Sequence, residues 1–162
     1  MSGPAQGGRH GDDVEMVALF MDMALAEARA AGEAGEVPVG CVVVCEGAVV
    51  ARAGNRTLTE RDPTAHAELI AIRAAAAALG SERLDGCDLY VTLEPCAMCA
   101  GAVAFARIRR LYYGAADPKG GAVENGVKFF ASPSCHHRPE VYGGLAEADA
   151  SALLKQFFQA RR

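Results

Sequence analysis

The sequence lacks the long apolar runs that mark membrane-spanning and exported proteins. No stretch of the 162 residues approaches the roughly 18 uncharged apolar residues that a transmembrane helix needs. The amino-terminal stretch MSGPAQGGRHGDD has no apolar segment of the kind found in signal peptides. Neither a membrane span nor secretion is indicated, so we expect a cytoplasmic protein.

The chain has six cysteines, but no disulfide framework is expected. Cytoplasmic thiols stay reduced, which leaves core packing, metal binding or catalysis as their roles. Cys41 and Cys45 would share one face of a strand about 13 Å apart, at ~3.3 Å per residue, which is too far to chelate one ion together. We expect both to be core residues and Cys87 to pack within a strand. We expect no second metal site at Cys135, although two histidines follow it.

Length and composition indicate one domain. Apolar residues make up 51% of the chain, enough for a sizeable core at this length, and no linker or internal repeat divides it. Residues 1–11 are glycine-rich and lack periodic apolar positions, so we expect a disordered amino-terminal tail there. Residues 12–162 are then the single domain.

The net charge of −4 conceals a gradient along the chain. Residues 1–50 hold two basic and eight acidic side chains, whereas residues 101–162 hold nine basic and five acidic ones. The last third, at +4, can therefore face phosphates. A solvated surface is the ordinary explanation for such an asymmetry, and both interpretations stay open at this point.

Apolar periodicity and turn residues predict alternating helices and strands, which implies an α/β layered fold whose sheet begins as a hairpin and continues through right-handed crossovers. Residues 115–139 are expected to form a long loop with a helical turn around 125–131. The other expected elements, in chain order, are a helix from near Val14 to Gly32 capped by Asp12 or Asp13, a hairpin turning at Glu46-Gly47, a helix from Thr64 or Ala65 to Gly80, a strand over 87–93, a helix from Pro95 to about Arg107, a strand over 108–114 and a helix over 147–162.

The segment PCAMC places two thiols on one face of a helix. Cys96 and Cys99 stand at positions i and i+3, and Pro95 fixes the first turn. The positive end of the helix dipole lowers the pKa of a thiol, and the thiolate is the form that binds metal or attacks an electrophile. Alone, this segment leaves a metal site, a redox pair and two inert buried thiols open.

A second segment, HAE, separates these alternatives. Helices that follow successive strands on one side of an open sheet begin at the same edge, so His66 can meet Cys96 and Cys99 there. One nitrogen and two sulfurs leave the fourth position of tetrahedral zinc for water, the arrangement of a catalytic site, and zinc lowers the pKa of that water toward neutrality. Glu68 is then the natural proton carrier.

Each residue of this segment also has an ordinary explanation. His66 can be a helix-capping residue, and Glu68 can be a partner of the helix dipole. Together with the cysteines, however, the pattern H-x-E followed by P-C-x-x-C is the signature of zinc-dependent nucleobase deaminases.

With these motifs, the chain resembles bacterial tRNA-specific adenosine deaminases of the cytidine-deaminase-like superfamily. The resemblance runs from about Val14 to Arg162 and also includes EVPVGCVVV, GNR (54–56), YYGAADPKGGA (113–122), HHRPEV (136–141) and LLKQFF (153–158). It implies a three-layer α/β/α fold in which a central, mixed, five-stranded sheet carries helices on both faces.

The resemblance also implies an activity and its partners. The expected reaction is hydrolytic deamination of adenosine to inosine at the wobble position of a tRNA anticodon, chiefly in an arginine tRNA with an ACG anticodon. The expected cofactor is one Zn²⁺ per subunit, and the expected assembly is a homodimer that binds the anticodon stem-loop with both subunits. By the same resemblance, the substrate contacts are Asn55 on the purine, Ala67 at the pocket wall through its backbone, and Arg56, Asp117, Lys119, His137 and Arg138 on neighbouring nucleotides. Asn55 can also be a simple turn residue after a strand.

Two other functions stay open. The same motifs occur in deaminases of a free base or nucleoside, such as guanine or cytosine, and these need no phosphate-binding surface. A non-catalytic zinc module, in which the metal only joins two helices, would need a fourth protein ligand and would give Glu68 no role.

Overall fold

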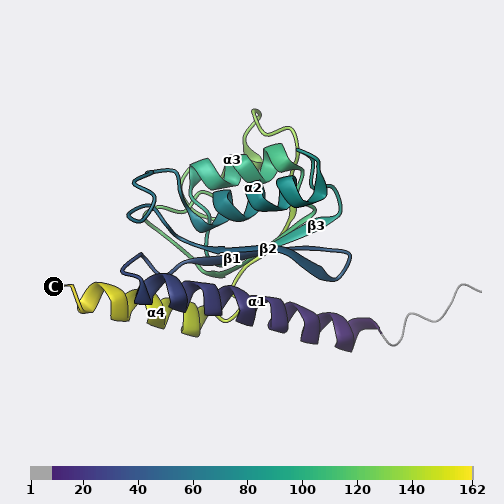
Figure 1. Ribbon diagram of the computed structural model, residues 1–162. Coiled ribbons are helices and arrows are strands. Elements are labelled where there is room, and N and C mark those ends of the chain that lie inside the picture. Colours follow the sequence, from purple (N-terminus) through teal and green to yellow (C-terminus); the bar gives the residue numbers. More distant parts are fainter. Residues whose placement is uncertain (1–8, 162) are drawn as a thin grey trace, which may run out of the picture.

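The computed structural model describes residues 9–161 as a five-stranded mixed sheet between two layers of helices (Figure 1). The strand order is β2-β1-β3-β4-β5; β1 is antiparallel to β2 and β3, and β4 is parallel to β3 and β5. The elements are α1 (Arg9–Glu33), β1 (Gly40–Cys45), β2 (Ala48–Gly54), α2 (Ala67–Leu79), β3 (Cys87–Leu93), α3 (Ala97–Ala106), β4 (Arg110–Ala115), the 3₁₀ turn η1 (Phe129–Ala131), β5 (Glu140–Tyr142) and α4 (Glu147–Gln159).

The two helical layers cover opposite faces of the sheet. Helices α2 and α3 lie on one face, and α1 and α4 lie on the other (Figure 1). Strand β1 shows why the layers form, because its alternate residues are buried on both sides. Cys41 and Val43 pack in the cluster with α2 and α3, whereas Val42 and Val44 pack against α1. The three-layer α/β/α fold is confirmed.

The hairpin turn follows its sequence signature. Glu46 and Gly47 both have positive φ angles, 53° and 78°. This is the backbone of a type I′ turn, whose twist matches that of the flanking strands. Cys45 then stands opposite Cys87 in the β1–β3 pair, and Cys87 is fully buried in the strand, as expected.

The expected start of the first helix needs correction, and one strand was missed. Helix α1 begins at Arg9 instead of near Val14, so Asp12 and Asp13 lie within the helix and neither is its cap. Of the expected tail, residues 1–8 lie outside the described residues. Strand β5 was not predicted from the residue pattern, because Glu140–Tyr142 is only three residues long. Within residues 9–161, no helix is both long and apolar enough to cross a membrane.

The chain directions place the starts of α2 and α3 together. Strands β2 and β3 are both antiparallel to β1, so they point the same way and end at the same edge of the sheet. Helix α2 follows β2, and helix α3 follows β3. Both helix amino-termini therefore lie at this edge, which is where a site forms in an open α/β sheet.

Candidate active site

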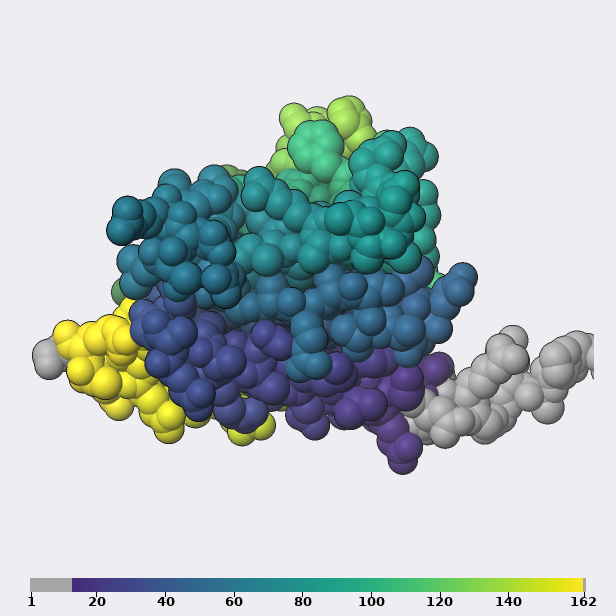
Figure 2. Space-filling view, in the orientation of Figure 1, coloured from purple at the N-terminus to yellow at the C-terminus, as the bar shows by residue number. Residues whose placement is uncertain are grey.

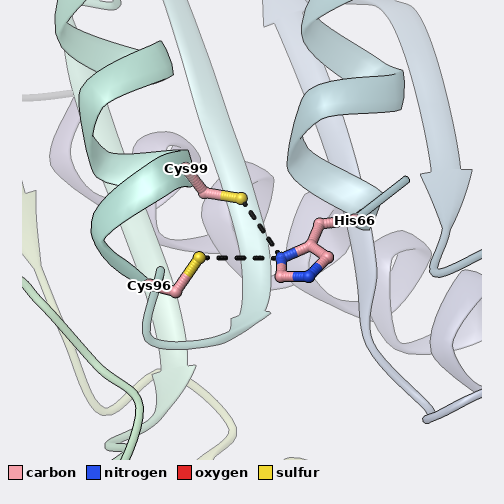
Figure 3. Close-up of side chains that lie close together, drawn as sticks. All are labelled: His66, Cys96 and Cys99. Carbon is pink, nitrogen blue, oxygen red and sulfur yellow. Dashed lines mark hydrogen bonds between the residues drawn. The ribbon is translucent and has the colours of Figure 1, made fainter. Parts of the chain in front are cut away.

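The starts of α2 and α3 bring three metal-binding side chains together. His66 is the residue immediately before α2, and Cys96 is the residue immediately before α3. His66 Nδ1 lies 3.6 Å from Cys96 Sγ and 3.5 Å from Cys99 Sγ (Figure 3). The ligand atoms of all three residues lie within 4.8 Å of one another.

This spacing fits tetrahedral zinc. Zinc bonds of about 2.3 Å to sulfur and about 2.05 Å to nitrogen, at a tetrahedral angle, separate the two ligand atoms by about 3.6 Å. The observed sulfur–nitrogen distances are 3.6 and 3.5 Å. No fourth cysteine, histidine or carboxylate joins this group within the described part of the chain. His66, Cys96 and Cys99 can therefore hold one Zn²⁺, and three protein ligands would leave one position of the ion for water, as in catalytic sites.

The two thiols differ in their readiness to ionise. A hydrogen bond from the Cys99 thiol, helped by His66, lowers the pKa of Cys96 to about 4 despite partial burial. The same bond to Cys96, together with burial, raises the pKa of Cys99. The hydrogen bond with Cys96 also raises the pKa of His66. One thiolate is thus ready for a metal ion, and the second must lose its proton when the ion binds.

A cavity of about 350 Å³ opens beside the metal ligands. This size lies within the range of small-molecule sites. It brings together most of the residues expected from the sequence, whereas Cys99 lies buried behind it. The lining consists of Val37, Val39, Asn55, Thr57, His66, Ala67, Glu68, Leu93, Glu94, Cys96, Asp117 and Gly120.

Glu68 is a buried carboxyl group in this cavity. It stands in the first turn of α2, two residues from the ligand His66, and only 4% of its surface is exposed. Burial raises the pKa of Glu68 above its usual value, because removal from water disfavours the charged form. A carboxyl group with a raised pKa can take up a proton and release it again near neutral pH.

Asn55 presents an unsatisfied acceptor to the cavity. Its side chain is 9% exposed, and its Oδ1 atom is buried without a hydrogen-bond partner. The backbone N–H of Asn55 donates to the carbonyl of Val39, so the turn explanation accounts for its backbone but not for its side chain. A buried polar atom without a partner calls for an explanation, and a ligand that supplies the missing donor is one.

Two buried carboxylates beside the cavity were missed from the sequence. Glu36 accepts hydrogen bonds from the backbone N–H groups of Leu58 and Thr59 at 3.1 and 2.8 Å, which holds the loop after Asn55. Glu94 accepts several backbone hydrogen bonds from the loop that contains Asp117. The sequence shows that Glu94 precedes the cysteine motif and that Glu36 precedes a strand. It does not show their hydrogen-bond partners, because most of these are backbone N–H groups.

The other residues predicted to contact the substrate do not line the cavity. Lys119 is exposed on the loop that follows Asp117. Arg56 is exposed and pairs with Glu60 at 2.9 Å. His137 lies elsewhere, with its Nε2 atom 2.7 Å from the carbonyl oxygen of Ile108, just before the opposite end of β4.

The structure does not bring His137 and Arg138 to the cavity of their own chain. The segment that contains them, residues 132–138, projects beyond α3 at the top of the molecule (Figure 2). Their roles as contacts to nucleotides stay predictions.

The fold and the site define a class of enzyme, a zinc-dependent hydrolytic deaminase. A sheet of this topology carries a His/Cys/Cys zinc site with an open position and a buried carboxyl group beside it, as that chemistry requires. Residues 15–115 match the family described as the cytidine and deoxycytidylate deaminase zinc-binding region, and the chain belongs to this family.

Relatives within the family differ in their similarity to this chain. The tRNA-specific adenosine deaminase of Agrobacterium fabrum is 64% identical over 143 residues, which cover 88% of this chain and 94% of that protein. A solved structure from a study of A-to-I editing by tRNA A34 deaminases at the wobble position has a TM-score of 0.83 and 65% identity, and covers 84% of this chain and 99% of that one. The guanine deaminase of Bacillus subtilis has a TM-score of 0.61 and 36% identity, with 88% and 92% of the two chains covered.

Proposed function

We propose that the protein deaminates adenosine to inosine at the wobble position of a tRNA anticodon, chiefly in an arginine tRNA with an ACG anticodon. The observation that carries the proposal is the arrangement of the cavity, where Glu68, Asn55 and the open side of the metal site face one space. We prefer tRNA to a free base as the substrate because of sequence identity, which is 64% with a tRNA-specific adenosine deaminase and 36% with a guanine deaminase. A tRNA substrate is consistent with a cytoplasmic location for the protein, which is part of the proposal.

The residues of the cavity account for the chemistry. Bound zinc supplies a source of hydroxide at neutral pH. Glu68 takes a proton from the attacking water and passes it to the ring nitrogen while the water oxygen bonds to the amino-bearing carbon. It then carries the second proton to the amino group, so that the carbon–nitrogen bond breaks and ammonia leaves. The free Oδ1 atom of Asn55 accepts a hydrogen bond from the nucleoside and fixes its position. His66, Cys96 and Cys99 hold the metal ion throughout.

An anticodon loop suits a cavity of this size. The groups that act on the base lie inside a cavity of about 350 Å³, so the target base must leave its stack to reach them. Bases in a loop are only partly stacked, which lowers this cost. The exposed residues Lys119 and Arg56 would then face the flanking nucleotides, together with Asp117 at the cavity wall.

The proposal is tested by measuring which substrate the protein deaminates. The purified zinc enzyme is incubated with an anticodon stem-loop that bears the ACG anticodon and, separately, with adenosine, guanine and cytosine. We expect inosine in the stem-loop only. A stem-loop with guanosine in place of the wobble adenosine is the matched control. Turnover of free bases without turnover of the stem-loop would replace this proposal with the free-base alternative.

The proposal includes a homodimer, supported by the outer surface of α3. Met98 and Phe105 stand seven residues apart on this helix, hence on one side, and are 37% and 82% exposed. A largely exposed phenylalanine on the same side of a helix as a second exposed apolar side chain supports a surface that another protein covers. Sedimentation should give twice the chain mass for the wild type and for Val127→Asp, a substitution on a loop, but a smaller mass for Phe105→Asp. A monomeric wild type would remove the dimer from the proposal.

A further inference from the structure

A loop without helix or strand forms one side of the cavity. It runs from Asp117 to Asn125, between β4 and η1, and its residues Asp117 and Gly120 line the cavity. The loop belongs to neither helical layer, so its position depends on a few specific contacts. Five of these contacts are made by one side chain, Glu94, which lies immediately after β3 and just before the cysteine motif.

Glu94 binds both ends of this loop. Its Oε1 atom accepts hydrogen bonds from the backbone N–H of Asp117 at 3.0 Å and from Nδ2 of Asn125 at 2.7 Å. Its Oε2 atom accepts hydrogen bonds from the backbone N–H groups of Val123, Glu124 and Asn125 at 3.1, 3.0 and 3.1 Å. The side chain is 2% exposed, so these five bonds replace water entirely.

The loop also packs directly on this carboxylate. A Cβ atom added at Gly121 would lie 2.5 Å from Glu94 Cδ and Oε2, and 2.5 Å from the carbonyl oxygen of Asp117. No side chain therefore fits between the loop and Glu94. The backbone N–H of Glu94 donates to the carbonyl of Ala115 in β4, which fixes the anchor to the sheet. The loop makes one further hydrogen bond next to the anchor, from the backbone N–H of Ala122 to the carbonyl of Pro95.

The contacts continue from Glu94 to the cavity wall. The Asp117 side chain accepts hydrogen bonds from the backbone N–H groups of Lys119 and Gly120 at 3.1 and 2.9 Å. The position of Asp117 therefore sets the path of the residues that face the substrate. Both carboxylate oxygens of Glu94 accept hydrogen bonds from the loop. Its role therefore differs from that of the metal ligands and from that of the proton carrier Glu68.

We propose that Glu94 is a positioning residue that holds the loop from Asp117 to Asn125 against the cavity and thereby sets the affinity for substrate. It takes no part in metal binding or proton transfer. The inference rests on the proposed function only for the identity of the substrate, because the contacts between Glu94 and the loop do not depend on it.

The test compares Glu94→Gln with Glu82→Gln, which alters an exposed glutamate outside the site. Glutamine places an NH₂ group against backbone donors and so breaks the anchor. We expect amide hydrogen exchange at residues 117 and 123–125 to become at least about tenfold faster, and KM for the stem-loop to rise about tenfold. Zinc content, exchange within α2 and α3, and kcat within about threefold should stay as in the wild type.

Two further variants keep the test decisive if Glu94→Gln does not fold. Asn125→Ala removes one of the five hydrogen bonds, and Gly121→Ala pushes the loop away while Glu94 is unchanged. Both should show the same effects, with a smaller rise in KM for Asn125→Ala. Unchanged loop exchange, or faster exchange without a change in KM, would overturn the proposal. If the wild type acts only on a free base, the proposed function fails and KM is measured for that base.

Discussion

His66 Nδ1 lies 3.5 Å from Cys99 Sγ, although 33 positions separate these residues in the chain. The distance follows from topology, because β2 and β3 point the same way and each is followed by a helix on the same face. The metal site is therefore a property of two helix starts. Changes that remove a ligand should act on metal binding while the rest of the fold remains.

Cys96→Ala and Cys99→Ala should each lose zinc. Two remaining protein ligands cannot hold the ion, so occupancy should fall from about one ion per chain to near zero. Elemental analysis of the purified proteins measures this directly. Cys135→Ala is the control, because its thiol donates a hydrogen bond to the carbonyl of His137 and lies outside the site. Full zinc occupancy in both ligand variants would contradict the assigned ligands.

Glu68→Gln should keep the metal and lose turnover. The amide has nearly the same shape but cannot carry the proton, so kcat should fall by roughly 10²–10⁴-fold. Zinc content and circular dichroism should match those of the wild type. An active Glu68→Gln enzyme would exclude Glu68 as the proton carrier.

Asn55→Val should weaken substrate binding without loss of stability. The unpaired Oδ1 atom costs free energy in the free enzyme, so an apolar side chain of similar size should leave the thermal midpoint unchanged or raise it. KM should rise about tenfold or more, because the nucleoside loses its partner. Thermal unfolding and steady-state kinetics test the two parts separately. A variant with a lower midpoint and an unchanged KM would favour the turn-residue explanation.

Lys119→Ala should reduce the salt dependence of RNA binding. If the exposed ammonium group neutralises one phosphate, its removal lowers affinity at low salt and reduces the slope of log affinity against log salt by about 0.7–0.9. Titrations of the stem-loop at several salt concentrations give this slope. The same slope in the variant and the wild type would place Lys119 away from the RNA.

Glu36→Gln should change the pH dependence of stability. The hydrogen bonds from Thr59 and Leu58 outweigh burial and lower the pKa of Glu36 below its usual value. The unfolded chain therefore takes up this proton first, so the stabilisation is complete above about pH 5 and is lost as the pH falls through the lowered pKa. At pH 7 the variant should be less stable by about 1–3 kcal/mol, and the difference should shrink as the pH falls through the lowered pKa of Glu36.

Urea unfolding at several pH values measures this difference. Glu82→Gln is the control, because its side chain is exposed and it shares any acid-driven loss of zinc. A constant gap between wild type and Glu36→Gln across the range would show that the carboxylate of Glu36 does not carry the effect.

The sequence predicted those features whose signals are local. The strand over 87–93 was predicted with the bounds that the structure gives it, and the helices that follow His66 and Cys96 start within a few residues of their predicted positions. These elements have clear periodicity and flanking proline or glycine residues, and the metal ligands follow from their directions. The chemistry of the site could therefore be predicted from the sequence alone.

Features that depend on tertiary contacts could not be predicted in this way. Strand β5 has three residues, too few for a pattern. The position of His137 is set by a hydrogen bond to Ile108, a contact between segments 29 residues apart. Glu94 is a glutamate within a familiar motif, but its role is defined by backbone donors, which every residue type except proline provides.

The backbone hydrogen bonds to Glu94 allow the loop and the zinc site to change independently during evolution. Four of the five donors to Glu94 are backbone N–H groups, so the loop stays attached with many different side chains, provided that residue 121 remains glycine and residues 117 and 123–125 are not proline. Sequence drift within the loop can change which nucleic acid is accepted, while the zinc site continues to perform the same reaction. Acquisition of a new substrate then needs substitutions in the loop and no rebuilding of the catalytic centre.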